Sequence, residues 1–281
     1  MSNVNASETM SDVNSCKRSK NSIIDDLMSS LKKLESSSFY TQFVEDMERT
    51  EFKAQIERVT GSSNDDDYPY CSELVQLVVY GVGSIAYSEV SRMQLCLALL
   101  MKRKYEWIDD VVVYDPILTS NEKLAIETFF SANLNHFLYL TLPNENENCR
   151  RRVARPTMFF MPHLPYELMN NLLEANWKVE NLNKIIILGN SFSEHKLTYY
   201  DINPIPCGKV DSNKDRNDKH ILGILKNNYT VEMPLPKTYR LIQMNYVPID
   251  LSDSVWMRAF STLSWHFFLL HDSTDLNILL S

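Results

Sequence analysis

The sequence lacks any apolar run of the roughly 18 to 20 residues that a membrane-spanning helix requires. Its first residues also lack the apolar core of a secretory signal peptide. These two absences predict a soluble intracellular protein with no membrane partner. With 281 residues and 44% hydrophobic content, the chain can bury one large core, with or without an appendage.

An excess of basic residues is missing as well, since 28 Lys and Arg face 36 Asp and Glu and leave a net charge of -8. Because binding to a phosphate backbone needs a broad positive surface, we expect no nucleic-acid partner. The five cysteines are odd in number and form no CxxC pair, which argues against a disulfide framework and a structural zinc site. The six histidines form no HExxH motif, and no Ser or Cys stands in a GxSxG elbow. Neither a metal centre nor a hydrolase is therefore predicted.

Three regions of the chain differ in composition. Residues 1–22 are rich in Ser and Asn and poor in apolar side chains, which predicts a disordered tail. Apolar residues recur at helical spacing over residues 23–60, which predicts a helical appendage packed on the main domain. The turn-forming stretch GSSNDDDYP at 61–69 ends this pattern, so we expect the main domain over residues 70–281.

From residue 74 onward, short apolar runs alternate with helical patterns. The runs that predict strands are LVQLVVY (74–80), DVVVY (110–114), a weaker one at 137–140, TMFFM (157–161) and KIIIL (184–188). Apolar strands separated by helices indicate a parallel sheet with helices on both faces. We therefore predict an α/β fold with a Rossmann-like, doubly wound, mostly parallel sheet. Residues 228–235 and 239–246 are candidate edge strands.

Polar or turn-forming segments follow each predicted strand. They are, in order, GVGSIAYSEVSR, DPILT, NENENCRRR, PHLP and GNSF. Because the carboxyl ends of parallel strands meet at one edge of the sheet, these segments should converge there. Ligands of such sheets bind at that edge, so the sequence predicts a site at this rim.

The segment GVGSIA fits the pattern GxGxxA of a dinucleotide-binding loop. Gly81 would make the tight turn, Gly83 would let the backbone approach a ligand, and Asp115 after the second strand would bind a ribose. This pattern is compatible with S-adenosylmethionine or a nucleotide, although Asp115 lies beyond the usual spacing of about 20 residues. It also fits a ligand-free turn, in which both glycines adopt positive φ and Asp115 stabilises the next turn.

The other candidate ligand-binding residues at the rim are Ser84, Arg92, His163, Asn190 and Ser191. Ser84 and the nearby Ser88 contact a ligand or cap the helix that follows. Arg92 binds an anion or pairs with an acid such as the one after the second strand. His163 is the candidate catalytic residue, as a general base, unless its ring bonds a neighbouring carbonyl.

Heme is a further candidate cofactor. Cys149 and Cys207 are the cysteines that could ligate its iron, and the alternative for each is a small packed side chain.

Five motifs follow one another between residues 80 and 192. They are YGVGSIAYSEVSRMQLCLALL (80–100), VVYDPILTSNE (112–122), NENCRRRV (146–153), PTMFFMPHLPYELMNNLLEANW (156–177) and IIILGNSF (185–192). In this order they resemble the sensitivity-to-red-light-reduced (SRR) domain family, with a motif-bearing core at 74–192. The chain departs from the family at Cys149, where Gly is common, and at Ser261 and Thr262, where Asn and Asp are usual.

The resemblance implies a regulatory role and protein partners that remain to be identified. Family members are linked to the circadian clock and light signalling in plants, and to heme biosynthesis, growth and cell proliferation in animals and fungi. They are expected in the cytoplasm and nucleus. Two hypotheses follow: an intracellular regulator with a candidate small-molecule ligand at the rim, and a transferase that depends on S-adenosylmethionine or a nucleotide.

Overall fold

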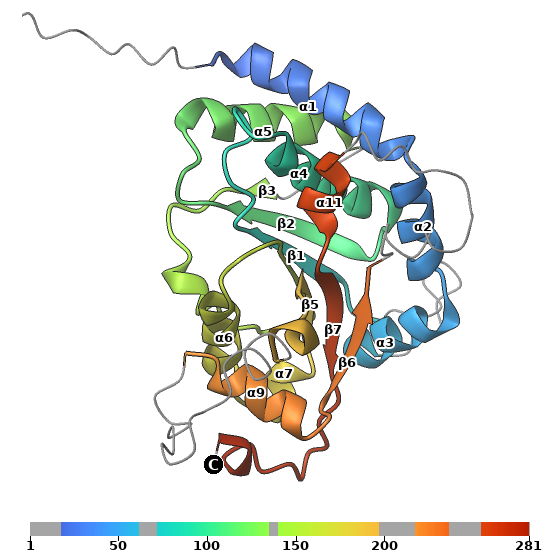
Figure 1. The fold of residues 1–281 in the computed structure, drawn as a ribbon, viewed down its shortest axis with the longest axis vertical. Helices are drawn as coiled ribbons and strands as arrows, with labels where there is room; N and C mark the ends of the chain where they lie inside the picture. The colour runs from blue at the N-terminus through green and yellow to red at the C-terminus, as the bar shows by residue number, and fades with distance from the viewer. Residues whose placement is uncertain (1–17, 62–71, 135–139, 197–216, 236–253, 281) are drawn as a thin grey trace, which may run out of the picture.

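A seven-stranded sheet forms the centre of the molecule (Figure 1). The computed structural model describes residues 18–61, 72–134, 140–196, 217–235 and 254–280. The strands are β1 (Val75–Tyr80), β2 (Ile108–Tyr114), β3 (Leu140–Thr141), β4 (Thr157–Met161), β5 (Ile185–Asn190), β6 (Thr230–Pro234) and β7 (Leu263–Phe268). Their order is β3-β2-β1-β4-β5-β7-β6, with β1 to β5 parallel and β7 antiparallel to both of its neighbours. The predicted α/β, doubly wound, mostly parallel sheet is confirmed.

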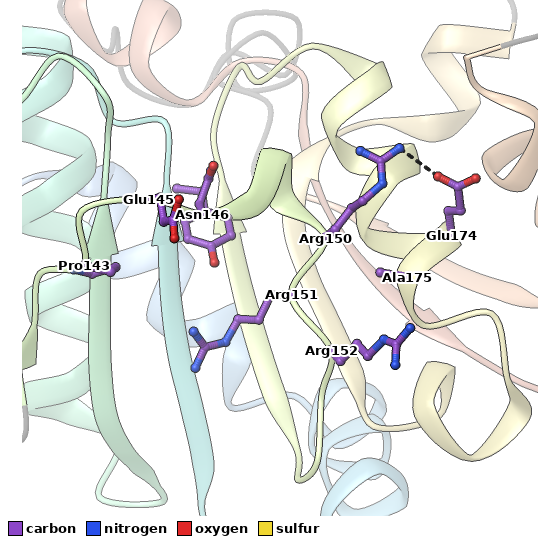
Figure 2. Close-up of a pocket in the computed structure, with 9 residues that line it drawn as sticks. Pro143, Glu145, Asn146, Arg150, Arg151, Arg152, Glu174 and Ala175 are labelled. Atoms are coloured by element: carbon purple, nitrogen blue, oxygen red, sulfur yellow. Dashed lines mark hydrogen bonds and ion pairs between the residues drawn. The ribbon is translucent and has the colours of Figure 1, made fainter.

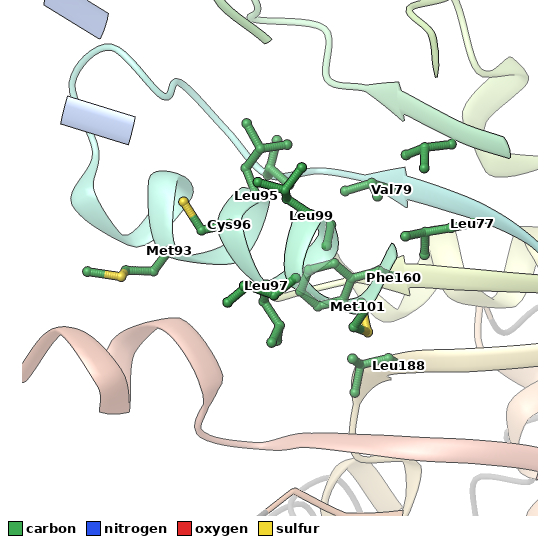
Figure 3. Packing of buried hydrophobic residues seen from close by; sticks show 14 of the residues in the cluster. Leu77, Val79, Met93, Leu95, Cys96, Leu97, Leu99, Met101, Phe160 and Leu188 are labelled. Atoms are coloured by element: carbon green, nitrogen blue, oxygen red, sulfur yellow. The ribbon is translucent and has the colours of Figure 1, made fainter. Parts of the chain in front are cut away.

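The first strand and the helix after it show how the sequence builds this sheet. β1 is apolar almost throughout, and Leu77 and Val79 point to the face that helix α4 (Glu89–Lys104) covers. The helix begins after Ser88, whose side chain accepts a hydrogen bond from an amide of the first turn. Leu95 and Leu99 of α4 belong to the same fully buried cluster as the two strand residues (Figure 3). Each such side chain contributes about 1.5 to 3 kcal/mol by leaving water.

Three N-terminal helices, α1 (Lys20–Glu35), α2 (Ser38–Met47) and α3 (Thr50–Thr60), share this core. α1 packs on α4 and on α5 (Ser120–Asn133), as Figure 1 shows. Phe43 of α2 and Phe52 of α3 lie against Trp265 of β7, with ring centroids 6.0 and 5.0 Å away. The helical region predicted at 23–60 is therefore packed on one face of the sheet.

The first helix begins earlier than the composition predicts. Lys20 is already helical, and the Ser19 side chain caps the helix by accepting a hydrogen bond from the amide of Ser22. Arg18 donates to the carbonyl of Ala86 at 2.6 Å, far away in the sequence. The disordered tail predicted for 1–22 is therefore wrong for its last residues, because a cap and a long-range contact order them. Residues 1–17 lie outside the described residues.

The opposite face of the sheet carries α6 (Tyr166–Ala175), the short α7 (Val179–Leu182), α9 (Lys219–Lys226) and the C-terminal 3-10 segment η3 (Ile278–Leu280). The connection from β3 to β4, residues 142–156, is described throughout and contains only one 3-10 segment, η1 (Glu147–Cys149). This connection therefore crosses the sheet as a loop, where a regular doubly wound fold would place a helix.

The C-terminal strands match the prediction only in part. β6 lies within the predicted strand at 228–235, whereas the strand predicted at 239–246 lies outside the described residues. The weak strand at 137–140 corresponds to β3, which begins at Leu140, and residues 137–139 are not described. β7 follows helix α11 (Ser254–Phe260) and was not predicted. Its sequence LSWHFF mixes Ser, Trp and His with apolar residues, yet all six residues are buried between β5 and β6.

Candidate functional site

The segments that follow the parallel strands converge at one edge of the sheet. β1 pairs with β2 and β4, and β4 pairs with β5, all in parallel. The carboxyl ends of these four strands therefore lie together, as predicted. The connections after β1 and β4 lead to opposite faces, so the crevice between these two strands is the place where ligands of this fold class bind.

Both glycines of the loop after β1 adopt a backbone conformation that other residues avoid. φ is 75° at Gly81 and 77° at Gly83. A Cβ atom added to Gly81 would lie 2.3 Å from Cδ2 of Leu164, in the loop after β4. At Gly83 it would lie 2.9 Å from the hydroxyl of Ser91. The crevice between β1 and β4 therefore holds the side chain of Leu164 directly against Gly81.

Asp115, directly after the neighbouring strand β2, is hydrogen-bonded to the same loop. Its carboxylate accepts hydrogen bonds from the amide of Gly83 at 2.8 Å and from the amide of Ile117 at 3.0 Å. The first bond joins the end of β2 to the glycine loop, and the second stabilises the turn after β2. An amide that would hold a phosphate in a dinucleotide-binding loop is thus bound to a carboxylate of the chain itself.

Glu122 binds the same loop at a second position, through Ser84 and Ala86. This fully buried carboxylate accepts hydrogen bonds from the Ser84 hydroxyl at 2.6 Å, the Ala86 amide at 3.0 Å and the Thr119 amide at 2.8 Å. Burial acts to raise the pKa of Glu122, but the hydrogen bonds outweigh it and leave the pKa lowered. Ser84 therefore binds Glu122, and the expectation that it caps α4 is wrong, because Ser88 takes that place.

Arg92 does not pair with the acid after β2. Its guanidinium donates to the carbonyl of Ile85 at 2.9 Å and lies 3.7 Å from Asp26 of α1. Of the two roles that the sequence left open, pairing with an acid is the one observed, but the acid is Asp26 and not Asp115, because α1 packs on α4. Local spacing could not reveal this partner.

His163 and Asn190 hold the loop after β4. The His163 ring lies with Nε2 3.1 Å from the carbonyl of Ala259, and its amide donates to Oδ1 of Asn190 at 3.1 Å. Asn190 in turn donates to the carbonyl of Leu164 at 2.8 Å. Of the two roles that the sequence left open for His163, the contact with a neighbouring carbonyl is the one observed. Both residues thereby fix the loop that places Leu164 against Gly81.

Ser191 belongs to a polar cluster that the sequence did not reveal. Its hydroxyl donates to Glu232 of β6 at 2.5 Å, and Ser193 donates its hydroxyl and its amide to the same carboxylate at 2.6 and 3.0 Å. His266 of β7 is fully buried beside them, with Nε2 3.8 Å from Glu232. Burial lowers the pKa of His266. The Ser191 hydroxyl bonds the Glu232 carboxylate and not the imidazole.

A third histidine, His195, lies near Ser191. His195 lies 2.8 Å from Asp218 and stacks on the ring of Tyr166 at 3.8 Å between centroids. The hydroxyl of Tyr166 donates to the carbonyl of Ser191 at 2.9 Å, and burial raises the pKa of this hydroxyl to about 12. These contacts tie the segment after β5 to α6 and to the residue before α9. Their members are distant in sequence, so no local motif signals them.

A hollow of about 770 Å³ lies beside the connection from β3 to β4 (Figure 2). Its lining includes Tyr80 at the end of β1, Glu145, Asn146 and the three consecutive arginines 150–152. The sequence predicted NENENCRRR as a polar segment of the rim and named only Cys149 in it, as a candidate heme ligand, so its arginines were assigned to no site. The feature of the sequence that could have indicated this hollow was the run of three arginines in an acidic chain.

Metal and heme ligation find little support in the described residues. Among them, no group of three or more His, Cys, Asp or Glu is arranged to hold a metal ion. Cys149 is fully buried, and burial raises the pKa of its thiol to about 12, so it is poorly suited to ligate a heme iron. Cys207 lies outside the described residues. Separately, none of the described helices has the length and apolar character that crossing a bilayer demands.

Comparisons with known proteins place this arrangement in a family. The chain is 41% identical over 168 residues to the protein SENSITIVITY TO RED LIGHT REDUCED 1 of Arabidopsis thaliana, which covers 59% of this chain and 54% of that protein. It is 35% identical over 125 residues to an SRR1-like protein of Mus musculus, which covers 42% of this chain and 45% of that protein.

A third relative, an SRR1-like protein of Drosophila melanogaster, is 26% identical over 127 residues and covers 44% of this chain and 42% of that protein. The chain thus spans about half the length of the curated relatives it matches. No solved structure matches it significantly. The SRR1 domain model, in contrast, matches residues 27–267, from the first helix to the last strand, and the chain therefore belongs to the SRR1 domain family.

Proposed function

We propose that this chain is a regulatory protein of a light-response pathway, which acts through protein partners in the cytoplasm and nucleus. The observation that carries the proposal is the 41% identity to an Arabidopsis protein named for reduced sensitivity to red light. The finer parts of the proposal are an input to the circadian clock and the regulation of heme biosynthesis and cell proliferation. These parts rest on the five motifs that resemble the family.

The state of the rim supports a regulator over an enzyme. The amides of Gly83 and Ala86 are bound to Asp115 and Glu122, and Leu164 lies against Gly81. No rim hydroxyl among the described residues bonds an imidazole that could activate it. A protein that acts by binding partners needs none of these groups to be free.

Complementation tests the regulatory proposal. In Arabidopsis seedlings that lack the 41% identical relative, expression of this chain should restore the growth response to red light. The empty vector is the control for the transformation, and immunoblotting establishes that the chain accumulates. Full accumulation of the chain without any recovery of the response would contradict the proposal.

A transferase that uses S-adenosylmethionine is the second candidate function, and the strand order favours it. The first five strands stand in the order β3-β2-β1-β4-β5, which is the order of a dinucleotide-binding fold. Asp115 follows β2, where such a fold places the acid that binds a ribose. The carboxylates bound to the loop amides oppose this function, because they occupy the groups that a cofactor would contact.

Ligand binding at the rim decides between the two functions. A thermal-shift titration with S-adenosylmethionine, NAD(P) and adenine nucleotides should show a saturable rise in melting temperature if the rim holds a cofactor. The rise should disappear in Asp115→Asn. No shift at concentrations well above physiological, or a shift that persists in Asp115→Asn, would favour the regulator over the transferase.

A further inference from the structure

The hollow beside the β3–β4 connection has the size of a small-molecule site. Its volume of about 770 Å³ lies within the roughly 300 to 1,000 Å³ typical of such sites. It exists because residues 142–156 cross the sheet face as a loop with one 3-10 segment and no α-helix, all within described residues. Figure 2 shows this loop between the strands on one side and α6 on the other.

The loop is held in a costly backbone conformation. Two consecutive residues, Asn148 and Cys149, have φ of 52° and 65°, a region that residues other than glycine enter at a cost. Cys149 anchors the turn, because its side chain is fully buried and its amide donates to the carbonyl of Asn146 at 2.8 Å. Such strain persists only where the surroundings impose it, and it gathers at binding sites.

Buried asparagines of α6 and its end impose this conformation. Asn176 is fully buried, accepts a hydrogen bond from the amide of Val153 at 2.9 Å and donates to the carbonyl of Arg151 at 2.8 Å. It therefore clamps the backbone on both sides of Arg152. Asn171 donates to the carbonyl of Asn148 at 3.1 Å. The starting points of the arginine side chains are thus fixed before any ligand arrives.

Two arginines of this connection have carboxylate partners. Arg150 pairs with Glu174 at 2.9 Å, and Arg155 pairs with Asp109 and Asp110. These ion pairs neutralise the first and last arginine of the segment. Arg151 and Arg152, which lie between these two arginines in the sequence, take no part in these ion pairs.

The other two arginines lack a carboxylate partner in the described part of the chain. Arg151 donates to the neutral side-chain carbonyl of Gln76 at 2.8 Å. Arg152 is exposed and makes no hydrogen bond or ion pair with a described residue. The lining holds three arginines against two glutamates, Glu145 and Glu174, so the hollow carries a net positive charge in a chain whose net charge is -8.

We propose that this hollow binds a small molecule that carries more than one phosphate group, with Arg151 and Arg152 as its phosphate contacts. The planar guanidinium group forms paired hydrogen bonds with phosphate oxygens, and Arg151 would exchange a neutral partner for a charged one. Figure 2 shows Arg151 extending toward the strands and Arg152 toward α6, which suits a ligand with separate anionic groups. Glu145 and Asn146 offer an acceptor and a donor to the rest of the molecule.

Isothermal titration calorimetry of the full chain with ATP, pyrophosphate and AMP tests this site. The wild-type chain should bind one ATP, and pyrophosphate more tightly than AMP, because the phosphates carry the recognition. Arg152→Gln should weaken ATP binding at least tenfold, and Arg151→Gln should do the same. The control is Arg49→Gln, which removes the same charge from a side chain that is 60% exposed at the start of α3, away from the hollow.

Two control variants test whether ATP binds in this hollow and not elsewhere on the chain. Arg49→Gln and the rim variant Asp115→Asn should both leave the dissociation constant for ATP unchanged. No binding of any of the three compounds at millimolar concentration would overturn the proposal. An equal loss in Arg49→Gln and Arg152→Gln would mean diffuse charge attraction and would overturn it as well. So would a loss in Asp115→Asn alone, since that result places the ligand at the rim.

Discussion

The loop after β1 and the connection from β3 to β4 balance their polar groups in opposite ways. In the glycine loop, Asp115 and Glu122 accept the amide hydrogen bonds of Gly83 and Ala86. In the arginine connection, two guanidinium groups lack a carboxylate partner among the described residues. The glycine loop, which carries the better-known ligand motif, is thus closed, because carboxylates of the chain occupy its amides. The arginine connection, which carries no such motif, is open, because two of its guanidinium groups have no carboxylate partner among the described residues.

The difference has a physical cause. A carboxylate carried by the chain is in place as soon as the sheet forms, so it satisfies the loop amides without the entropy cost of capturing a ligand. A phosphate would have to displace Asp115 and bring further negative charge close to the buried Glu122. Arg152, in contrast, is exposed and has no carboxylate within ion-pair distance among the described residues. Unbalanced charge, more than a glycine pattern, marks the place where this fold can take up an anion.

Of the variants considered, Glu122→Gln should destabilise the chain most, because it disrupts the hydrogen bonds of the closed loop. One oxygen of Glu122 accepts from Ser84 and Ala86 and the other from the amide and hydroxyl of Thr119. A glutamine would turn an NH2 group toward one pair of donors, so we expect a loss of about 3 kcal/mol in the free energy of unfolding. Urea unfolding measures it. Glu127→Gln, an exposed site on the same helix, is the matched control and should change the free energy by less than about 0.5 kcal/mol.

The wild-type chain and Glu122→Gln should also differ in the pH dependence of their stability. The pKa of Glu122 is lowered in the folded chain, so its contribution to stability is present above the ordinary carboxyl pKa and is lost as pH falls through the folded value. The free energy of unfolding of the wild-type chain should therefore decline more steeply in acid than that of Glu122→Gln. Identical slopes in the two chains would show that this carboxylate does not hold the loop.

Gly81→Ala should have the next largest effect, about 2 kcal/mol of destabilisation. The new Cβ meets Leu164 in a backbone conformation with φ of 75°. Thermal and urea unfolding give the loss for the single variant. In a Leu164→Ala background the same change should cost less, because the clash is gone and only the backbone strain remains. An equal cost in both backgrounds would mean that Leu164 does not fill the crevice.

The sequence predicted the sheet better than it predicted the site. Apolar runs such as 185–190 in β5 and the helical periodicity of α4 are local, so they fix strands, helices and the shared edge. Strand β7 was not predicted, because His266 and Ser264 interrupt its apolar pattern. Pairing with both neighbouring strands nevertheless buries it. Burial there depends on partners that are distant in the chain.

The position of the candidate site could be predicted from the sequence, but most contacts within it could not. Gly83 and Asp115 meet at the rim as expected, and the structure adds a hydrogen bond between these two residues. The acid beside Arg92 comes from α1, and the carboxylate beside Ser191 comes from β6. Side chains find partners through tertiary packing, which spacing along one chain does not encode.

Asp115→Asn should separate the structural from the ligand-binding interpretation of the closed loop. Asparagine keeps one acceptor for the amide of Gly83 but loses the charge and the second acceptor for Ile117. We expect a loss of about 1 kcal/mol in unfolding free energy, measured by urea titration alongside the thermal-shift screen. Unchanged stability together with loss of a bound cofactor would instead make Asp115 a ligand contact, and the glycine loop would be open after all.

Arg152→Gln should change stability least, by under about 0.5 kcal/mol, because the side chain is exposed and its charge has no described partner. The contrast with Asp115→Asn is direct, since each variant removes one charge from one of the two segments. The first should alter anion binding and spare folding, and the second should alter folding and spare anion binding. Urea unfolding of both variants in one buffer makes the comparison. If Arg152→Gln cost more than about 1 kcal/mol, the guanidinium would be engaged in the fold, and the charge that makes this connection the open one would already be balanced.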